Sequence, residues 1–318
     1  MKDNKIRLGI SSCLLGAQVR YDGGHKLDRY LRDVLGEYVD YVPVCPEVEV
    51  GLPVPRESLR LVKDKNNQIR LVFARSGKDL TEQMENWSWK RVRQLEGERL
   101  DGFIFKSKSP SSGMERVKLY DLNGVPHKVG VGVFARIFMA HFPLLPVEEE
   151  GRLNDPKLRE NFITAIFTLK RWRQMLGQEQ TVANLINFHS RHKLLLLSHS
   201  EKIYRDMGRL VANGEQLPLE ELFRQYQSLL IQALRLKTTI KKHINVLQHI
   251  LGYFKRHLSS DEKQETLELI DAYRQELVPL IVPLTLMNHF VRKYEQPYLQ
   301  QQVYLHPHPK ELKLLNHV

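Results

Sequence analysis

The first half of the chain alternates short apolar runs with segments of helical periodicity, and no other feature constrains the fold as strongly. The strand-like runs are residues 5–11, 38–45, 68–74 and 101–109. The segments with apolar residues at helical intervals are residues 25–38, 79–98 and 131–142. Strands that alternate with helices form βαβ units, so the sequence predicts an α/β domain with a mostly parallel sheet. Ligands of such sheets bind beyond the carboxyl ends of the strands, especially where the strand order reverses.

The pattern changes near residues 143–158, where prolines, three glutamates and a glycine precede a capping Asn or Asp. We therefore predict an α/β domain over residues 1–148 and an all-α helical domain over residues 155–318. Within the second domain, residues 217–258 are compatible with one very long helix or with two. The tail from residue 296 onward is expected to be irregular.

The net charge of +11 is unevenly distributed. Residues 1–150 carry 24 Lys and Arg against 21 Asp and Glu, whereas residues 151–318 carry 24 against 16 and ten of the thirteen histidines. A basic second half favours a polyanionic partner, most often nucleic acid. The alternative is an ordinary solvated helical surface, and charge alone does not choose between the two.

The sequence also indicates where in the cell the protein is expected to lie. No window approaches eighteen uninterrupted apolar residues, and the N-terminal residues lack the apolar run of a secretion signal. We therefore expect a cytoplasmic protein with neither a membrane partner nor a secreted one. Two cysteines in such a chain argue against a disulfide scaffold, so each is a packing residue, a metal ligand or a nucleophile.

Three segments of the first domain place small or reactive residues where a predicted strand ends. They are "SSCLLG", "PVCPEVEVGLPVPR" and "SKSPSSG". If the strands are parallel, these loops open at one edge of the sheet, and Cys13 and Cys45 are placed to share one soft metal ion or cluster. Thiolates favour iron–sulfur or zinc, although the spacing has no zinc-finger register. The alternative is that both cysteines are buried as small apolar side chains.

Longer motifs carry a resemblance to a known family. "ISSCLLGAQVRYDGGHK", "VPVCPEVEVGLPVPR" and "SKSPSSGMERVKLYD" resemble the signature segments of the thiouracil desulfurase (TudS) family. Two later segments, beginning "FHSRHKLLLLSH" and "LVPLIVPLTLMNHF", resemble the YbgA-like helical domain that is often fused to it. The combination is similar to tRNA 4-thiouridine desulfidases over nearly the whole chain. The resemblance therefore implies an enzyme whose partner is tRNA with a thiolated uridine.

The resemblance also implies a [4Fe–4S] cluster held by three cysteines, with one iron left open. Cys13 and Cys45 match the first two ligands, and Ser112 stands where the third cysteine is expected. A serine hydroxyl ionises far less readily than a thiol and is a harder ligand. We therefore expect the cluster to be labile or absent in this form of the chain. Whether Ser112 is a natural residue or a substitution is left open.

The catalytic assignments rest on the same resemblance. Glu47, two residues after Cys45, is expected to act as the acid–base group beside the cluster. Ser109 is expected to act near the substrate. The alternatives are a carboxylate at a helix start for Glu47 and a turn-capping serine before Pro110 for Ser109. No redox change is required, because the sulfur leaves as sulfide.

Charged residues near these motifs are predicted to bind substrate. Arg20 and Asp22 lie in "VRYDGGHK", where the N–H groups of a Gly-Gly turn suit a phosphate or a uracil carbonyl. Lys106 and Lys108 are expected to meet RNA phosphates. The alternatives are a plain turn and the solvent-exposed end of a strand.

The second domain supplies the residues predicted to contact RNA: His189, Arg191, His192, Lys193, Lys237, Lys241 and Lys242. His189, His192 and His199 fall on one helical face, but no acidic partner for a metal site is obvious there. The lysines belong to a basic stripe that suits a phosphate backbone, with salt-sensitive affinity.

Three functions remain open from the sequence. The first is desulfuration of thiolated uridine in tRNA, with the second domain binding the RNA. The second is the same chemistry on free thiouracil or a thionucleoside, with a structural or oligomerising second domain. The third is a non-catalytic RNA-binding protein whose cluster site has decayed.

Overall fold

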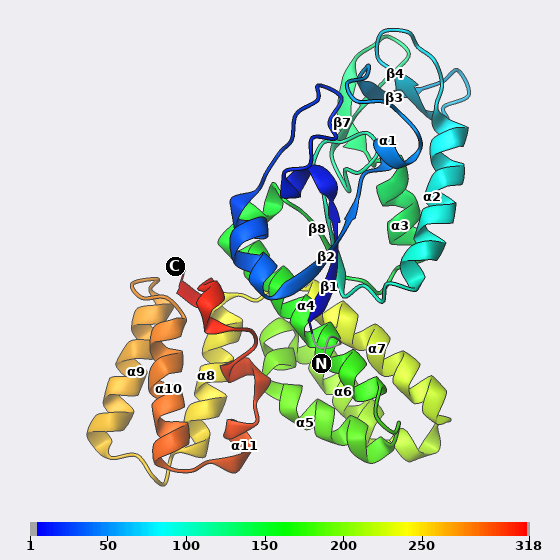
Figure 1. Ribbon diagram of the computed structural model, residues 1–318. Coiled ribbons are helices and arrows are strands. Elements are labelled where there is room, and N and C mark those ends of the chain that lie inside the picture. Colours follow the sequence, from blue (N-terminus) through cyan, green and yellow to red (C-terminus); the bar gives the residue numbers. More distant parts are fainter. Residues whose placement is uncertain (1–4, 317–318) are drawn as a thin grey trace. The chain divides into compact units, whose positions relative to one another are not determined.

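The computed structural model describes residues 5–316, which form two compact units (Figure 1). One unit ends at Asn154 and the other begins at Asp155. Asp155 caps the first helix of the second unit, because its carboxylate accepts hydrogen bonds from the N–H groups of Lys157 and Leu158. The predicted change from α/β to helical structure is confirmed.

The main sheet of the first unit is fully parallel, as predicted. It contains β1 (Ile6–Ser11), β2 (Val39–Val44), β5 (Gly102–Phe105) and β8 (Val147–Glu149) in the order β2-β1-β5-β8. The chain places β2 on one side of β1 and later adds β5 on the other side. The strand order therefore reverses between β1 and β5, and the carboxyl ends there mark the expected ligand site.

Two helices and a cluster of aromatic rings build the core of this unit. α2 (Thr81–Glu96) and α3 (Val133–His141) lie side by side (Figure 1). The ring centroid of Phe103 on β5 lies 4.6 Å from that of Phe138 on α3. Gly9 of β1 makes room for this contact, because a Cβ atom there would lie 2.2 Å from the Phe103 ring.

A second, mixed sheet contains β3 (Leu59–Lys63), β4 (Ile69–Phe73), β6 (Val117–Tyr120) and β7 (Pro126–Gly130) in the order β4-β3-β6-β7. The sequence pattern predicts only β4. β3 has one fully buried residue, β6 has only four residues, and β7 is exposed over its first four, so these strands carry little hydrophobic signal. The helix predicted over residues 25–38 is also wrong in extent, because only a π-helical turn at Tyr30–Val34 and a 3₁₀ turn at Leu35–Glu37 form.

The described part of the second unit contains helices and no strands. They are α4 (Pro156–Leu176), α5 (Val182–His199), α6 (Glu201–Ala212), α7 (Leu219–Arg235), α8 (Ile240–Tyr253), α9 (Ser260–Arg274), α10 (Ile281–Lys293) and α11 (Pro297–Gln300). Residues 217–258 contain two helices, and Thr239 caps the start of α8 by accepting a hydrogen bond from the Lys242 N–H. Beyond α11 the described chain forms only short 3₁₀ turns. Within residues 5–316, no helix has both the length and the apolar character to cross a membrane.

Candidate functional site

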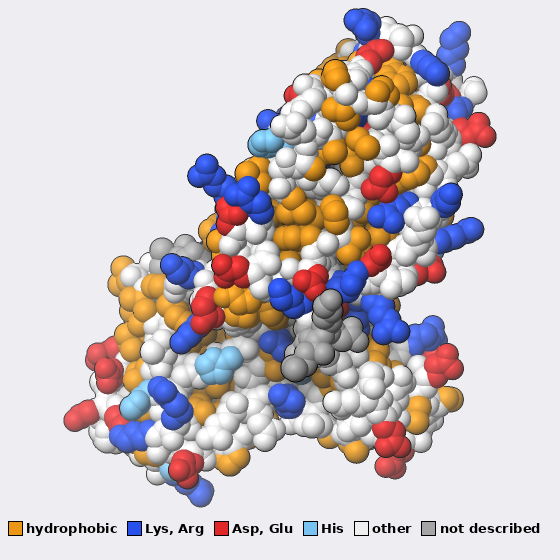
Figure 2. Space-filling model, in the orientation of Figure 1, with side chains coloured by type: hydrophobic (Ala, Val, Ile, Leu, Met, Phe, Trp, Pro, Cys, Tyr) orange, Lys and Arg blue, Asp and Glu red, His pale blue; other side chains and the backbone are white. Residues whose placement is uncertain are grey.

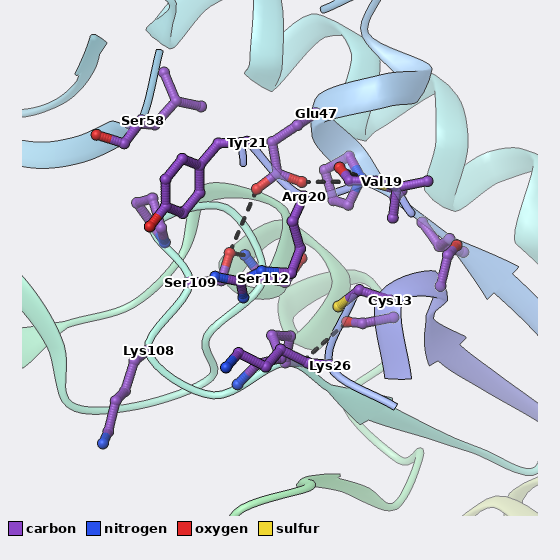
Figure 3. Close-up of a pocket in the computed structure, with 18 of the residues that line it drawn as sticks. Cys13, Val19, Arg20, Tyr21, Lys26, Glu47, Ser58, Lys108, Ser109 and Ser112 are labelled. Carbon is purple, nitrogen blue, oxygen red and sulfur yellow. Dashed lines mark hydrogen bonds between the residues drawn. The ribbon is translucent and has the colours of Figure 1, made fainter. Parts of the chain in front are cut away.

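A pocket of about 380 Å³ lies at the carboxyl ends of the parallel strands, where the strand order reverses (Figure 3). Its lining includes Cys13 after β1, Cys45 and Glu47 after β2, and Ser109 and Ser112 after β5. Three segments that are distant in sequence thus meet in one hollow. The geometry is the one expected for loops that follow neighbouring parallel strands.

The two cysteines are free thiols held on short, well-fixed turns. Cys13 belongs to a 3₁₀ turn, Ser12–Leu15, and its carbonyl accepts a hydrogen bond from the Lys26 N–H at 2.9 Å. Cys45 directly precedes α1 (Pro46–Glu49). Burial raises the pKa of Cys13 to about 11 and that of Cys45 to about 12. Both side chains are therefore neutral thiols near pH 7, and they must lose their protons to bind a metal.

The donor set fits an iron–sulfur cluster at two of the three expected positions. Cys13 and Cys45 offer soft sulfur atoms, whereas Ser112 offers a hydroxyl that lies 3.4 Å from Ser111 Oγ. Among residues 5–316, no group of three or more His, Cys, Asp and Glu side chains is arranged to hold a metal ion. The pocket thus brings two soft donors and one hydroxyl together, and the hydroxyl does not match a thiolate in chemistry.

Glu47 lies between Cys45 and the loop Ser109–Ser112, called the serine loop below. Its Oε2 accepts a hydrogen bond from Cys45 Sγ at 3.6 Å. Its Oε1 accepts from Ser109 Oγ at 3.5 Å (Figure 3). The carboxylate that accepts from the Cys45 N–H, at 2.9 Å, is that of Glu49, the last residue of α1. Glu47 also lies in the first turn of α1, which is the alternative considered for it, and its carboxylate is directed to Cys45 and Ser109.

Ser109 caps its turn and also lines the pocket. Its Oγ accepts hydrogen bonds from the N–H groups of Ser111 (3.3 Å) and Ser112 (3.1 Å), so it caps the turn. The same oxygen lines the pocket and reaches Glu47. Capping the turn holds the hydroxyl at the wall of the pocket.

The structure corrects two of the substrate-binding predictions. Lys106 lines the pocket, but its ammonium donates to the carbonyl and hydroxyl of Ser107, each at 3.0 Å, and to Glu150. These three acceptors use all its donors, so Lys106 is not available to an RNA phosphate. Asp22 does not line the pocket and instead binds Arg20 and the Gly24 N–H.

Other charged and aromatic residues remain at the pocket. Arg20 and Lys108, both predicted to bind substrate, line the pocket, and Lys108 is exposed. Sequence reasoning missed Tyr21, a half-exposed ring that lines the pocket with the Arg20 guanidinium 5.4 Å from its centroid. It also missed Ser111, which lies behind the pocket. Both belong to quoted motifs, but only the folded chain shows where their side chains point.

The histidines of α5 are core residues, which corrects their assignment to RNA contact. His189, His192 and His199 are at most 3% exposed. Their Nδ1 atoms bind Tyr226 Oη, the Phe188 carbonyl and the Leu236 carbonyl, respectively. Burial lowers the pKa of His189 to about 4 and that of His192 to about 3, so both are neutral near pH 7.

Lys242 has a structural role in addition to its predicted RNA contact. Its ammonium donates to the carbonyls of His199 and Lys237, each at 2.7 Å. Of the predicted RNA-contacting residues, Arg191, Lys237 and Lys241 are exposed and Lys193 is partly exposed. On the face drawn in Figure 2, basic side chains are interspersed with acidic ones.

Comparison with known proteins divides the chain in the same way. The model of the 2-thiouracil desulfurase family matches residues 8–150, and that of a protein family of unknown function, DUF1722, matches residues 193–309. The chain is 32% identical over 163 residues to the uncharacterized protein YbgA of Escherichia coli strain K12, covering 51% of this chain and 96% of YbgA. It is 31% identical over 108 residues to the uncharacterized protein YbbK of Bacillus subtilis strain 168, covering 33% of this chain and 71% of YbbK. A solved structure titled [4Fe-4S]-dependent thiouracil desulfidase TudS is 29% identical, with a TM-score of 0.39, and the match covers 48% of this chain and 95% of that one.

Proposed function

Because the chain belongs to the 2-thiouracil desulfurase family through its first unit and to the DUF1722 family through its second, we propose that it desulfurates 4-thiouridine in tRNA. The products are uridine and sulfide. The observation that carries the proposal is the single pocket shared by Cys13, Cys45, Glu47 and Ser109. Its position at the reversal of strand order is where an α/β sheet binds its ligand.

Cys13 and Cys45 would hold the [4Fe–4S] cluster of the family, with residue 112 as the third ligand. A bound cluster supplies a soft Lewis acid for the sulfur of a thiocarbonyl group. With serine at position 112, the protein is expected to hold the cluster weakly, because the hydroxyl is a harder donor than a thiolate. The protein with Ser112→Cys is therefore the form in which activity is to be measured.

The protein's own residues manage protons and orientation. The overall reaction adds water at the ring carbon and releases hydrogen sulfide, so one water is consumed and no electron is transferred. Glu47 accepts a proton from the attacking water, since its carboxylate lies beside Cys45 and faces the pocket. Ser109 orients the ring through its fixed hydroxyl, and Lys108 attracts the phosphates next to the target nucleotide.

Free 2-thiouracil is the second candidate substrate. The family's description favours it, and a pocket of about 380 Å³ accommodates a single nucleobase. The basic second unit favours tRNA. A base within folded tRNA must leave its stack to reach such a pocket, at a cost of roughly a few kcal/mol, which RNA contacts offset.

Substrate choice is tested with the reconstituted Ser112→Cys form, supplied in parallel with thiolated tRNA and with free 2-thiouracil. We expect kcat/KM to be about a hundredfold higher for tRNA, since contacts outside the pocket lower its KM. Sulfide release reports turnover, and nucleoside analysis confirms conversion to uridine. Faster turnover of free 2-thiouracil would overturn the tRNA assignment and leave the desulfurase assignment intact.

Binding of unthiolated tRNA tests the role of the second unit without catalysis. We expect the affinity to fall steeply with salt, and Lys237→Glu with Lys241→Glu to weaken it about tenfold and flatten the salt dependence. Lys202→Glu with Lys263→Glu, at exposed positions on α6 and α9 outside the predicted set, changes the net charge equally and is the matched control. Equal affinities for both variants in a filter-binding titration would exclude these lysines as RNA contacts.

A further inference from the structure

Ser111 is a buried polar residue just behind the pocket. Its side chain is fully buried, and it does not form part of the pocket lining. Its carbonyl accepts hydrogen bonds from the N–H groups of Phe134 (2.9 Å) and Ala135 (3.2 Å) in the first turn of α3. Gly132 packs so closely that a Cβ atom there would lie 2.5 Å from the Ser111 carbonyl atoms. The backbone of Ser111 therefore has one well-defined position.

The hydroxyl of Ser111 is the nearest hydrogen-bond donor to Glu47 in this loop. It donates a short hydrogen bond to Glu47 Oε1 and lies 3.0 Å from Ser109 Oγ. Ser109 Oγ itself is 3.5 Å from Oε1, at the outer limit of a hydrogen bond. Ser111 is thus the main support of the carboxylate, although Ser109 is the serine that faces the pocket.

This contact gives the two oxygens of Glu47 different surroundings. Oε1 faces Ser109 and Ser111, whereas Oε2 lies 3.6 Å from Cys45 Sγ. The last torsion of a glutamate side chain has a broad energy minimum, so the side chain itself does not select this orientation. The buried hydroxyl of Ser111, which has a fixed position, selects the orientation of the Glu47 carboxylate.

We infer that Ser111 is a positioning residue, whose buried hydroxyl holds Oε1 of Glu47 so that Oε2 is presented to the reacting ring beside Cys45. The inference rests on the proposed function, since it concerns the group that accepts the proton from water. Ser111 makes no contact with substrate, because it lies outside the pocket lining. A displacement of about 1 Å in a catalytic group can cost on the order of a hundredfold in rate.

The first test is a double-mutant cycle in the reconstituted Ser112→Cys form. Ser111→Ala is expected to lower kcat by about 10- to 100-fold and to change KM by less than about twofold. With Glu47→Gln already present, the same substitution is expected to lower kcat by less than about twofold, because Ser111 acts through Glu47. Equal losses in the two backgrounds would overturn the inference. Ser88→Ala, which removes a fully buried hydroxyl on α2, controls for the loss of a buried serine.

The second test needs no turnover. Crystal structures of the protein without cluster, with and without Ser111→Ala, are expected to show Glu47 Oε2 displaced from Cys45 in the variant only. An unchanged Glu47 would contradict the positioning role. If the Ser112→Cys form proves inactive, the proposed function fails by itself, and this comparison still decides whether Ser111 orients Glu47. Thermal unfolding of both proteins checks that the variant folds.

Discussion

Replacing Glu47 by glutamine in the reconstituted Ser112→Cys form is expected to lower kcat for sulfide release by about 10²- to 10⁴-fold. Glutamine keeps the size of the side chain and accepts a hydrogen bond from Ser111, but it cannot take a proton from water. Glu47 Oε2 lies 3.6 Å from Cys45 Sγ, whereas the nearby Glu49 accepts from the Cys45 N–H. Glu49 therefore cannot replace Glu47 without a movement of the chain. Single-turnover sulfide release measures the chemical step directly.

Glu49→Gln is the matched control for this substitution. Glu49 lies two residues further along α1, accepts from the Cys45 N–H and pairs with Arg91 at 3.0 Å. Glutamine there keeps an acceptor for the Cys45 N–H and loses only the charge pairing with Arg91, so the substitution is expected to destabilise the protein by less than about 1 kcal/mol and to reduce kcat less than Glu47→Gln does. A Glu47→Gln enzyme that keeps kcat within about threefold of its parent would refute the assignment of Glu47 as the acid–base group.

Replacing Ser112 by cysteine is expected to have the second large effect, a gain of metal. Ser112 is 3% exposed and lines the same pocket as Cys13 and Cys45, so a thiol there completes a set of three soft donors without a change of backbone. After anaerobic reconstitution we expect about four iron and four sulfide per chain in the variant and less than about one in the unsubstituted protein. Iron and acid-labile sulfide analyses measure both quantities.

Two further proteins make the iron measurement specific. Ser112→Ala removes the hydroxyl and is expected to load no more iron than the unsubstituted protein. Cys13→Ala combined with Ser112→Cys is expected to lose the cluster again, because two donors remain. Full loading of the unsubstituted protein would show that serine suffices as the third ligand. Failure of Ser112→Cys to load would show that the pocket does not hold a cluster.

The parallel sheet and the meeting of its loops could be predicted because they depend on local patterns. The segments around β1, β2 and β5 are apolar and end directly at Cys13, Cys45 and the serine loop. In a parallel sheet such ends meet at one edge whatever the rest of the chain does. The small mixed sheet could not be predicted in this way, because β7 has too few buried residues to show a pattern.

The side-chain partners that decide function come from distant parts of the chain, and sequence patterns do not show them. The Lys106 ammonium pairs with Glu150, which follows β8 and lies 44 residues further along the chain. Helical periodicity groups His189 and His192 on one face of α5, but it does not say whether that face meets solvent or the core. Tyr226, on α7, binds His189 and places it in the core.

The most direct test measures turnover of thiolated tRNA by the reconstituted Ser112→Cys protein and by its Glu47→Gln derivative. It asks whether the pocket contains both soft metal ligands and a proton acceptor. We predict stoichiometric sulfide and uridine from the first protein and almost none from the second, at equal iron content. A cluster-loaded first protein that leaves 4-thiouridine and 2-thiouracil unchanged would contradict the assignment of this pocket as a desulfurating site.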